Sequence, residues 1–329
     1  MGFHDVLQNC NSFIVFAHTA PDADAIASAM VTKMWLESIN PKNTVDVILD
    51  INQEGLELYE NLLIKSYNNP RLTSYECAIC VDCASEGRIA LGGYELQNFK
   101  HIINIDHHSS NTYFGTANIV LPKFSSTGEV IYLLMKRFNF SLTDVMAKFI
   151  YTSIITDTNC FSKISINSHT HQTVADLLKF NFDYKAIKVY FFQNNSKSKI
   201  YLTQKAFGSL RFYNNDTIAT MKITQRNFAQ TFATFEDSMG IVDSGLAIED
   251  VKICACFIEK QPNTYYVSLR GKGAVDIVAL ATYFGGGGSA GLGAFQFEGS
   301  LDKVETEFIE KATQIISNLP EDENKEIDF

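Results

Sequence analysis

Short apolar runs alternate with longer segments of helical periodicity throughout the first half of the chain. This alternation predicts an α/β fold, with a mainly parallel sheet flanked by helices. We predict strands at 12–17, 45–50, 77–82 and 102–106. Helices are predicted at 25–38, 54–64, 86–91, 126–138, 143–157, 168–180 and 183–192.

A polar run at 192–200 has no apolar periodicity and predicts a linker. The segment after it predicts a second α/β pattern, with helices at 200–211, 274–284 and 302–318 and strands at 217–223, 251–258, 264–270 and 294–298. The predicted organisation is a first domain at 1–191, the linker at 192–200, a smaller α/β domain at 201–320 and a solvated acidic tail at 321–329.

Composition narrows the class of protein. The chain is 46% hydrophobic and 19% charged, as ordinary globular proteins are, and no apolar run approaches a membrane span. The first residues lack the pattern of a signal peptide, so we expect a cytoplasmic protein without a membrane segment. The net charge of −10 argues against binding long nucleic acid, but bound divalent cations would still allow a small anionic substrate.

The cysteines add little chemistry. There are seven, and Cys77 and Cys80 have the CxxC spacing of zinc and redox sites. They lie within an apolar strand-like run with no second CxxC, so we interpret them as core residues. The odd number and the apolar surroundings favour free thiols over disulfides.

Acidic and histidine residues follow four of the apolar runs. They are His18, Asp22, Asp24, Asp82, Asp106, His107, His108 and Asp157. Each cluster alone could have a purely structural role. Asp22 and Asp24, for example, lie where a cap for the helix predicted at 25–38 would lie. If the runs are neighbouring parallel strands, however, their carboxyl ends converge in one crevice. Buried carboxylates repel one another unless cations neutralise them.

The types of ligand in these clusters indicate the metal and the reaction. Oxygen and imidazole ligands without a thiolate suit Mn²⁺ or Mg²⁺. Two such ions placed close together can activate a water molecule and hold a phosphoryl oxygen. The pattern therefore predicts a two-metal site for the hydrolysis of phosphate esters.

The motifs resemble those of the DHH phosphoesterases, which are named for the triplet that stands here at 106–108. The matching segments are His18-x-x-Pro21-Asp22-x-Asp24, Asp82, Asp106-His107-His108-x-x-Asn111 and Asp157, and the segment 126–129 resembles the one that follows the triplet in the family. The second half resembles the DHHA1 domain through Ser268-Leu269-Arg270 and the four glycines at 285–288. The resemblance extends from about residue 10 to about residue 300.

The resemblance implies a role for each site residue. His18 and Asp22 would hold one metal, and Asp24, His107 and Asp157 the other, with Asp82 bridging both. Asp106 would orient His107. His108 would face the phosphate, to stabilise its charge or to protonate the leaving oxygen.

The resemblance also implies how substrate is bound, in a cleft between the two domains. The implied substrate contacts are Asn111, Arg270, Gly286, Gly287, Gly288 and Ser289. Ser289 departs from the family, which places a histidine after the glycines. A serine can neither stack on a base nor carry charge, so the resemblance does not determine the substrate preference of this chain.

The implied activity is that of the stand-alone bacterial nanoRNase group, which cleaves short oligoribonucleotides such as pApA to mononucleotides and in several cases also hydrolyses pAp. A cyclic di-AMP phosphodiesterase would share the same metal ligands. An inorganic pyrophosphatase would share the first domain only, and a non-catalytic nucleotide sensor would have lost activity. The resemblance also allows for a homodimer.

Overall fold

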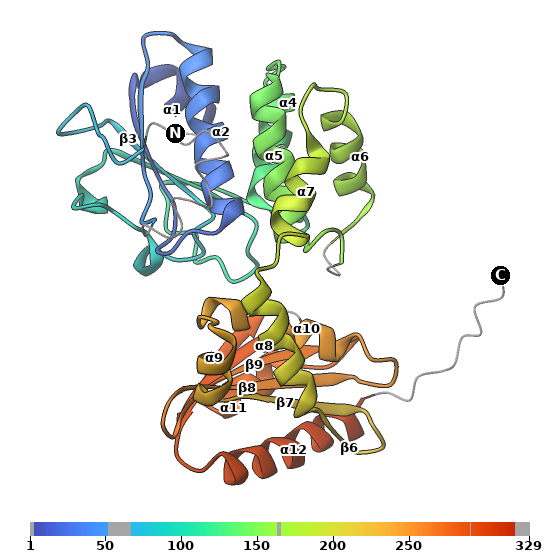
Figure 1. Ribbon diagram of the computed structural model, residues 1–329. Helices are drawn as coiled ribbons and strands as arrows, with labels where there is room; N and C mark the ends of the chain where they lie inside the picture. The colour runs from blue at the N-terminus through green and yellow to red at the C-terminus, as the bar shows by residue number, and fades with distance from the viewer. Residues whose placement is uncertain (1–2, 52–66, 163–165, 290, 320–329) are drawn as a thin grey trace. The chain divides into compact units, whose positions relative to one another are not determined.

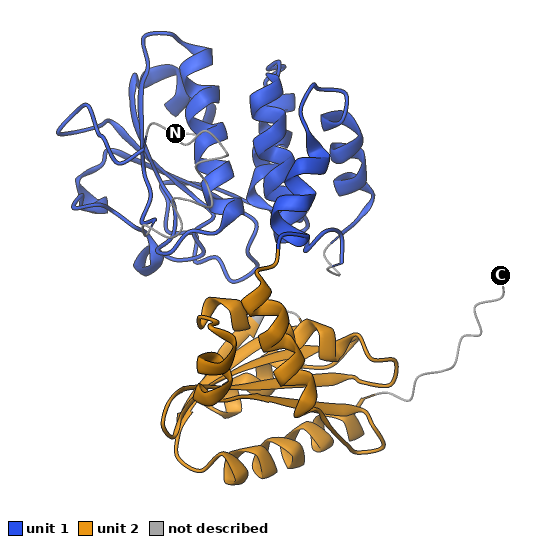
Figure 2. Cartoon of the chain, viewed as in Figure 1, with its two compact units in different colours: residues 1–194 blue, residues 195–329 orange. Residues whose placement is uncertain are grey.

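The computed structural model describes residues 3–51, 67–162, 166–289 and 291–319. The chain divides into two compact units, Met1–Asn194 and Asn195–Phe329 (Figure 2). Helix α8 (Lys197–Gly208) begins inside the segment predicted as a linker. The reason is that Ser196 caps this helix, accepting a hydrogen bond from the Lys199 N–H at 2.9 Å. The polar residues at the end of that run therefore start a helix.

The first unit, coloured blue to yellow-green in Figure 1, contains a sheet of five parallel strands. The order of the strands in this sheet is β2-β1-β3-β4-β5. The strands are β1 (Ser12–Phe16), β2 (Thr44–Ile48), β3 (Cys77–Val81), β4 (His101–Asp106) and β5 (Ala117–Val120). The predicted strands at 12–17, 45–50, 77–82 and 102–106 are confirmed within two residues. The short, half-exposed β5 was not predicted, because it lacks a continuous apolar run.

Helices of this unit pack on one face of the sheet, as β1 illustrates. Phe13 and Val15 of β1 join a large core cluster with the helices, whereas Ile14 and Phe16 point to the opposite face. The helices are α1 (Phe3–Asn9), α2 (Ala23–Ile39), α4 (Thr127–Arg137), α5 (Asp144–Asp157), α6 (Ser168–Leu177) and α7 (Tyr184–Phe192). The helix predicted at 54–64 lies outside the described residues.

The opposite face of the sheet packs against loops and two short 3₁₀ turns, η1 (Glu86–Arg88) and η2 (Leu96–Asn98). The prediction of an α-helix at 86–91 is therefore wrong. The chain leaves the helical conformation at Ile89, which is extended and forms an isolated antiparallel bridge with His18.

The second unit contains a sheet of six strands in the order β10-β11-β9-β8-β7-β6, in which only the β7–β8 pair is parallel. The strands are β6 (Arg211–Tyr213), β7 (Ile218–Ile223), β8 (Ile253–Gln261), β9 (Thr264–Gly271), β10 (Gly287–Ser289) and β11 (Leu292–Glu298). The helical segments are α8, α9 (Gln225–Thr231), η3 (Glu236–Ser238), α10 (Ile241–Leu246), α11 (Ile277–Tyr283) and α12 (Leu301–Ser317).

The long elements of this unit confirm the sequence prediction, and the short ones were missed. Strands β6 and β10 and helices α9 and α10 contain three to seven residues each, too few for periodicity to appear. The predicted tail at 321–329 lies outside the described residues. Within the described ranges, no helix is both long and apolar enough to cross a membrane.

All seven cysteines are free, and six of them are buried. Cys77 and Cys80 belong to β3, in which every residue is buried, and burial raises the pKa of both thiols above its usual value. The interpretation of this pair as core residues is confirmed. Cys160, three positions after Asp157, is the partly exposed exception.

Candidate metal centre

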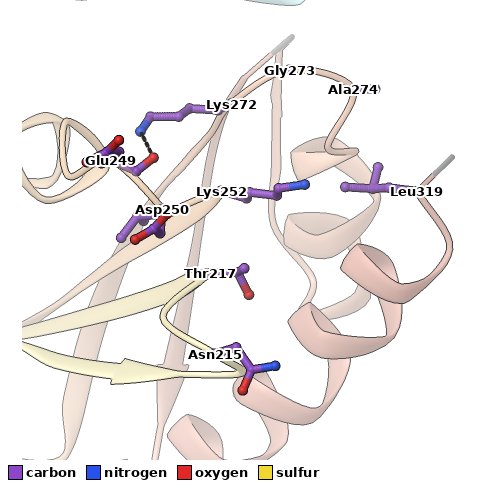
Figure 3. A pocket seen from close by; sticks show the side chains of 10 residues that line it. Asn215, Thr217, Glu249, Asp250, Lys252, Lys272, Gly273, Ala274 and Leu319 are labelled. Atoms are coloured by element: carbon purple, nitrogen blue, oxygen red, sulfur yellow. Dashed lines mark hydrogen bonds between the residues drawn. The ribbon is translucent and has the colours of Figure 1, made fainter. Parts of the chain in front are cut away.

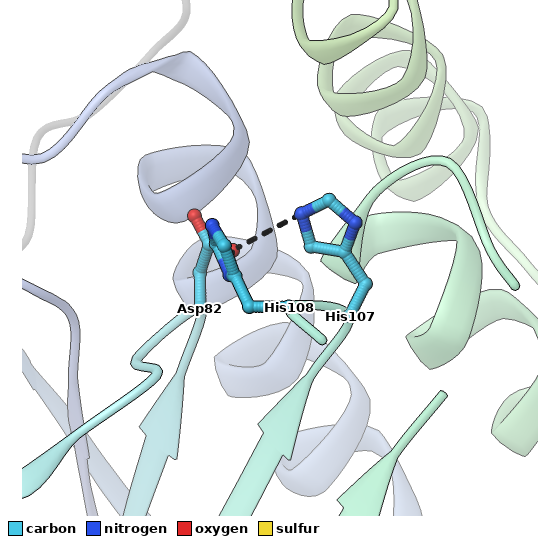
Figure 4. A group of neighbouring side chains, drawn as sticks. All are labelled: Asp82, His107 and His108. Carbon is cyan, nitrogen blue, oxygen red and sulfur yellow. Dashed lines mark ion pairs between the residues drawn. The ribbon is translucent and has the colours of Figure 1, made fainter. Parts of the chain in front are cut away.

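Parallel pairing brings the carboxyl ends of β1, β3 and β4 to one edge of the first sheet. His18 lies two residues beyond β1, Asp82 directly follows β3, and His107 and His108 directly follow β4 (Figure 4). The start of α2 and the end of α5 bring further carboxylates to this edge, from Asp22, Asp24 and Asp157.

The side chains form three groups whose potential ligand atoms lie within 4.8 Å of one another. The groups are His18, Asp22 and Asp82; Asp24, His107 and Asp157; and Asp82, His107 and His108. The first two are the ligand sets that the resemblance implies. A cavity of about 110 Å³ at this position is lined by His18, Asp22, Asp82, Ala84, Arg88, His107, His108 and Asp157.

Asp82 lies between the two sets of ligands. Its Oδ2 is 3.7 Å from Nε2 of His18, and its Oδ1 is 3.7 Å from Nε2 of His107. The same His107 nitrogen lies 3.9 Å from Asp24 Oδ2 and 3.5 Å from Asp157 Oδ2. Each oxygen of Asp82 thus faces a different group, as a carboxylate shared by two ions would.

The crowded carboxylates are costly to ionise without a cation. Burial, together with the neighbouring Asp157 and Asp22, raises the pKa of Asp24 to about 6, although His107 acts in the opposite direction. Burial and the nearby Asp24 raise the pKa of Asp82 well above its usual value. Divalent cations would remove this penalty, and the oxygen and imidazole donors match Mn²⁺ or Mg²⁺. The residues therefore fit a two-metal centre.

Asp82 adopts a left-handed backbone conformation, with φ of 58°. Such a conformation in a residue other than glycine costs roughly 1–3 kcal/mol and is typical of functional sites. The backbone N–H of Asp82 donates to the carbonyl of Ile105 at 3.0 Å. This bond to the end of the neighbouring strand holds the turn that aims the side chain into the cavity.

The N-terminus of α4 supports the carboxylates. The N–H groups of Thr127 and Gly128 donate to the two oxygens of Asp24 at 2.9 and 3.2 Å. The Ser153 hydroxyl also donates to Asp24, at 2.6 Å, and the Thr127 hydroxyl donates to Asp82 Oδ1 at 2.8 Å. The positive end of the helix therefore faces buried negative charge.

Sequence reasoning singled out the segment 126–129 by resemblance but gave it no role, and it missed Ser153. The one local signal is that Ser126 caps α4, its side chain accepting from the Glu129 N–H at 3.2 Å. The contacts of α4 with Asp24 join residues more than one hundred positions apart. Spacing along the chain could not reveal them.

Asp106 orients a different histidine from the expected one. Its Oδ1 lies 2.8 Å from Nδ1 of His108, whereas Nδ1 of His107 lies 3.3 Å from the carbonyl of Phe124. Side chains two positions apart on an extended chain point the same way, which pairs Asp106 with His108. The expectation that Asp106 orients His107 is therefore wrong.

The Asp106–His108 pair favours the charged form of both groups. Burial opposes ionisation of Asp106, but hydrogen bonds from His108 and Asn111 outweigh it and hold its pKa below the usual value. The hydrogen bond to Asp106 raises the pKa of His108 against the effect of burial. The His108 side chain is 40% exposed and lines the cavity, so a protonated imidazole can face a ligand there.

Asn111 does not occupy the position expected of a substrate contact. It is buried, and its amide nitrogen lies within hydrogen-bonding distance of Asp106 Oδ2 at 2.6 Å, Asn104 Oδ1 at 2.7 Å and the Cys83 carbonyl at 3.1 Å. Its own oxygen accepts from the Tyr113 N–H at 2.7 Å. These protein contacts satisfy the side chain and fix Asp106 from behind.

The predicted substrate residues of the second unit are Arg270 and the residues at 286–289. Arg270 is 18% exposed, and its Nε donates to Asp243 Oδ1 at 2.6 Å. Its Nη1 donates to the carbonyl of Leu269 at 2.9 Å. The guanidinium is therefore held in one orientation from the end of β9.

The glycine loop is partly explained by strand packing. A side chain at Gly286 or Gly288 would meet the carbonyls of Ala294 and Leu292 on β11 at 2.0 and 2.1 Å, so these positions need glycine for pairing. Gly287 has open space beside it. Ser289 ends β10 opposite Leu292, and its side chain lies outside the described part of the structure.

A larger cavity, of about 390 Å³, lies within the second unit at the starts of β7 and β8 (Figure 3). Its lining includes the acidic Glu249 and Asp250 and the basic Lys252 and Lys272. Lys272 donates to the Ile248 carbonyl at 2.6 Å. The described residues of this cavity include no group of potential metal ligands, so the size of a cavity does not locate the chemistry here.

Comparison with known proteins agrees with this geometry. Residues 12–155 match the model of the DHH family, N-terminal domain. This stretch of the first unit is therefore similar to the N-terminal domain of the DHH family.

Two curated relatives match most of the chain, including much of the second unit. The probable bifunctional oligoribonuclease and PAP phosphatase NrnA of Streptococcus mutans is 28% identical, covering 86% of this chain and 89% of the relative. The bifunctional oligoribonuclease and PAP phosphatase NrnA of Thermus thermophilus is 24% identical, covering 83% and 80%.

One solved structure is similar in fold over both units. An exopolyphosphatase-related protein from Bacteroides fragilis has a TM-score of 0.82 at 22% identity, covering 96% of each chain. At that identity the likeness shows the fold and leaves the substrate open.

Proposed function

We propose that this chain is a divalent-metal-dependent phosphodiesterase that hydrolyses short oligoribonucleotides, such as pApA, to mononucleotides and also removes the 3′-phosphate of pAp. The position of Asp82 carries the proposal, with one carboxylate oxygen toward His18 and the other toward His107. The two curated relatives, which are named as bifunctional oligoribonuclease and PAP phosphatase, support the choice of substrate. The net charge of −10 favours short substrates over long nucleic acid.

Each group of side chains has a proposed task. His18 and Asp22 would hold one ion, and Asp24, His107 and Asp157 the second, with Asp82 shared. The ions would supply Lewis-acid stabilisation of phosphoryl charge and a water of lowered pKa.

His108 has a separate proposed task. The hydrogen bond to Asp106 raises the pKa of His108 and so favours a protonated imidazole, whose ring nitrogen not bonded to Asp106 would donate to the leaving oxygen. In the second unit, Arg270 would contact a phosphate oxygen of the nucleotide.

The test is a turnover comparison with Mn²⁺ on pApA, a 5-mer RNA, pAp, cyclic di-AMP and pyrophosphate. We expect fast release of mononucleotides from pApA and the 5-mer, turnover of pAp, and loss of all activity with a chelator. Preferential opening of cyclic di-AMP would make the protein a cyclic-dinucleotide phosphodiesterase. Cleavage of pyrophosphate alone, or of nothing, would contradict the proposal.

A variant at the shared carboxylate tests the metal assignment. Asp82→Asn should lower turnover of every substrate to below about 1%, because both ions lose a ligand. Asp50→Asn, at an exposed carboxylate of the same unit, is the matched control and should keep full activity. Substantial residual turnover in Asp82→Asn would contradict the two-metal arrangement.

A further inference from the structure

Arg88 lines the cavity of about 110 Å³ at the candidate metal centre, although no sequence motif pointed to this residue. It is the last residue of η1 and lines the same cavity as His18, Asp82 and His108. Its carbonyl accepts from the Thr19 N–H at 2.8 Å, and the next residue, Ile89, forms a bridge with His18. The backbone at Arg88 is therefore hydrogen-bonded to the loop that carries His18, a proposed metal ligand.

The guanidinium of Arg88 has no hydrogen bond or ion pair with any residue in the described ranges. This is unusual, because Asp22, Asp82 and Asp157 line the same cavity. Those carboxylates group with histidine nitrogens at the two proposed metal positions. An exposed arginine that lines this cavity is therefore available to an anion that enters from solvent.

Charge balance indicates which anion needs it most. The four carboxylates of the two ligand sets, Asp22, Asp24, Asp82 and Asp157, would carry four negative charges, which two divalent ions would cancel. A phosphodiester adds about one negative charge, whereas a terminal phosphate adds about 1.5 to 2 at neutral pH. The guanidinium of Arg88, which lines the same cavity, would balance the additional negative charge of a terminal phosphate.

We propose that Arg88 binds a non-bridging oxygen of the reacting phosphate and sets the ratio of phosphatase to phosphodiesterase activity. Terminal phosphates, which are dianionic, depend on it more than internal diesters do. This inference rests on the proposed function, but its test includes a binding measurement that needs no turnover.

The experiment compares Arg88→Gln with the unchanged chain. The affinity of the Mn²⁺-loaded protein for AMP, a terminal phosphate, should fall about 10- to 100-fold, as expected for a lost charge-assisted hydrogen bond. Mn²⁺ affinity, measured separately by titration without nucleotide, should stay unchanged. The kcat/KM for pAp should fall several-fold more than that for pApA, and Arg88→Lys should restore part of the loss.

Arg137→Gln, which removes an exposed arginine at the far end of α4, is the matched control and should leave all these values unchanged. Unchanged AMP affinity in Arg88→Gln would overturn the inference. Loss of Mn²⁺ affinity would also overturn it, because Arg88 would then only shape the metal site. If the unchanged chain binds AMP but hydrolyses neither substrate, the proposed function fails while the AMP titration still decides the role of Arg88.

Discussion

The hydroxyl of Thr127 donates a 2.8 Å hydrogen bond to Oδ1 of Asp82, the oxygen that also faces His107. Both partners are buried. The bond fixes the rotation of the carboxylate on which both proposed metal positions depend, as partners behind a metal ligand generally do.

Replacing Thr127 with valine should therefore weaken metal binding. Thr127→Val keeps the shape of the side chain but removes the donor, and we expect Mn²⁺ affinity to fall about 10- to 100-fold. Metal titration of the purified variant measures this. Thr152→Val is the matched control, because the one partner of the buried Thr152 hydroxyl among the described residues is the carbonyl of Lys148 within α5. Equal Mn²⁺ affinities in the two variants would contradict the role of Thr127.

A side chain at Gly128 should disrupt the contact between α4 and α5. An added Cβ would lie 2.2 Å from Oγ of Ser153, which itself bonds Asp24. We expect Gly128→Ala to lower the free energy of unfolding by about 1–3 kcal/mol, as overpacking does, and to weaken Mn²⁺ binding. Denaturant unfolding measures the first effect. Gly208→Ala, where nothing lies within 4 Å, should be neutral or stabilising, and a neutral Gly128→Ala would refute the packing argument.

The stabilisation by metal should grow as pH rises. The folded-state pKa of Asp24, about 6, and that of Asp82 lie above the usual carboxyl value, so the metal-free fold loses stability as pH rises through this range. Mn²⁺ competes with the bound protons and removes the repulsion. At one fixed Mn²⁺ concentration, we expect the difference in Tm between Mn²⁺ and chelator to be larger at pH 7.5 than at pH 5. Where that concentration is 100 times the Kd, the stabilisation should be about 2.7 kcal/mol. A difference independent of pH would contradict this.

Asp243 should act through Arg270. Its carboxylate holds Nε of the guanidinium at 2.6 Å, so Asp243→Asn should loosen the proposed phosphate contact. We expect KM for pApA to rise about 5- to 50-fold with little change in kcat, and Mn²⁺ affinity to be unaffected. Asp216→Asn, at an exposed turn between β6 and β7, serves as control. A fall in kcat at constant KM would assign Arg270 a different task.

The sequence predicted that the proposed metal ligands would lie close together, because that depends on parallel strands ending at one edge of a sheet. His18, Asp82 and His107 each follow a long apolar run, and such runs are read well from the chain. The partners of the ligands depend on details that periodicity does not carry. Whether Asp106 bonds His107 or His108 is decided by the direction of side chains past the end of β4.

The remaining differences have the same physical origin. Thr127 and Ser153 approach Asp24 through the packing of helices distant in sequence, and Arg88 reaches the cavity from a single 3₁₀ turn. The loops that cover the second face of the sheet are fixed by contacts with Ile14 and Phe16, not by their own propensity. The hydrophobic pattern of a single sequence indicates helices and strands, but it does not determine contacts between side chains that are distant along the chain.

Asp24 connects three helices through hydrogen bonds. It belongs to α2, accepts hydrogen bonds from the first turn of α4, and accepts another from Ser153 of α5. We therefore expect assembly of the proposed metal centre and packing of these helices to depend on each other. Without the proposed ion, the Asp24 carboxyl must take up a proton or remain as a buried charge between three helices. Occupancy of the site would then change how firmly these helices are held together.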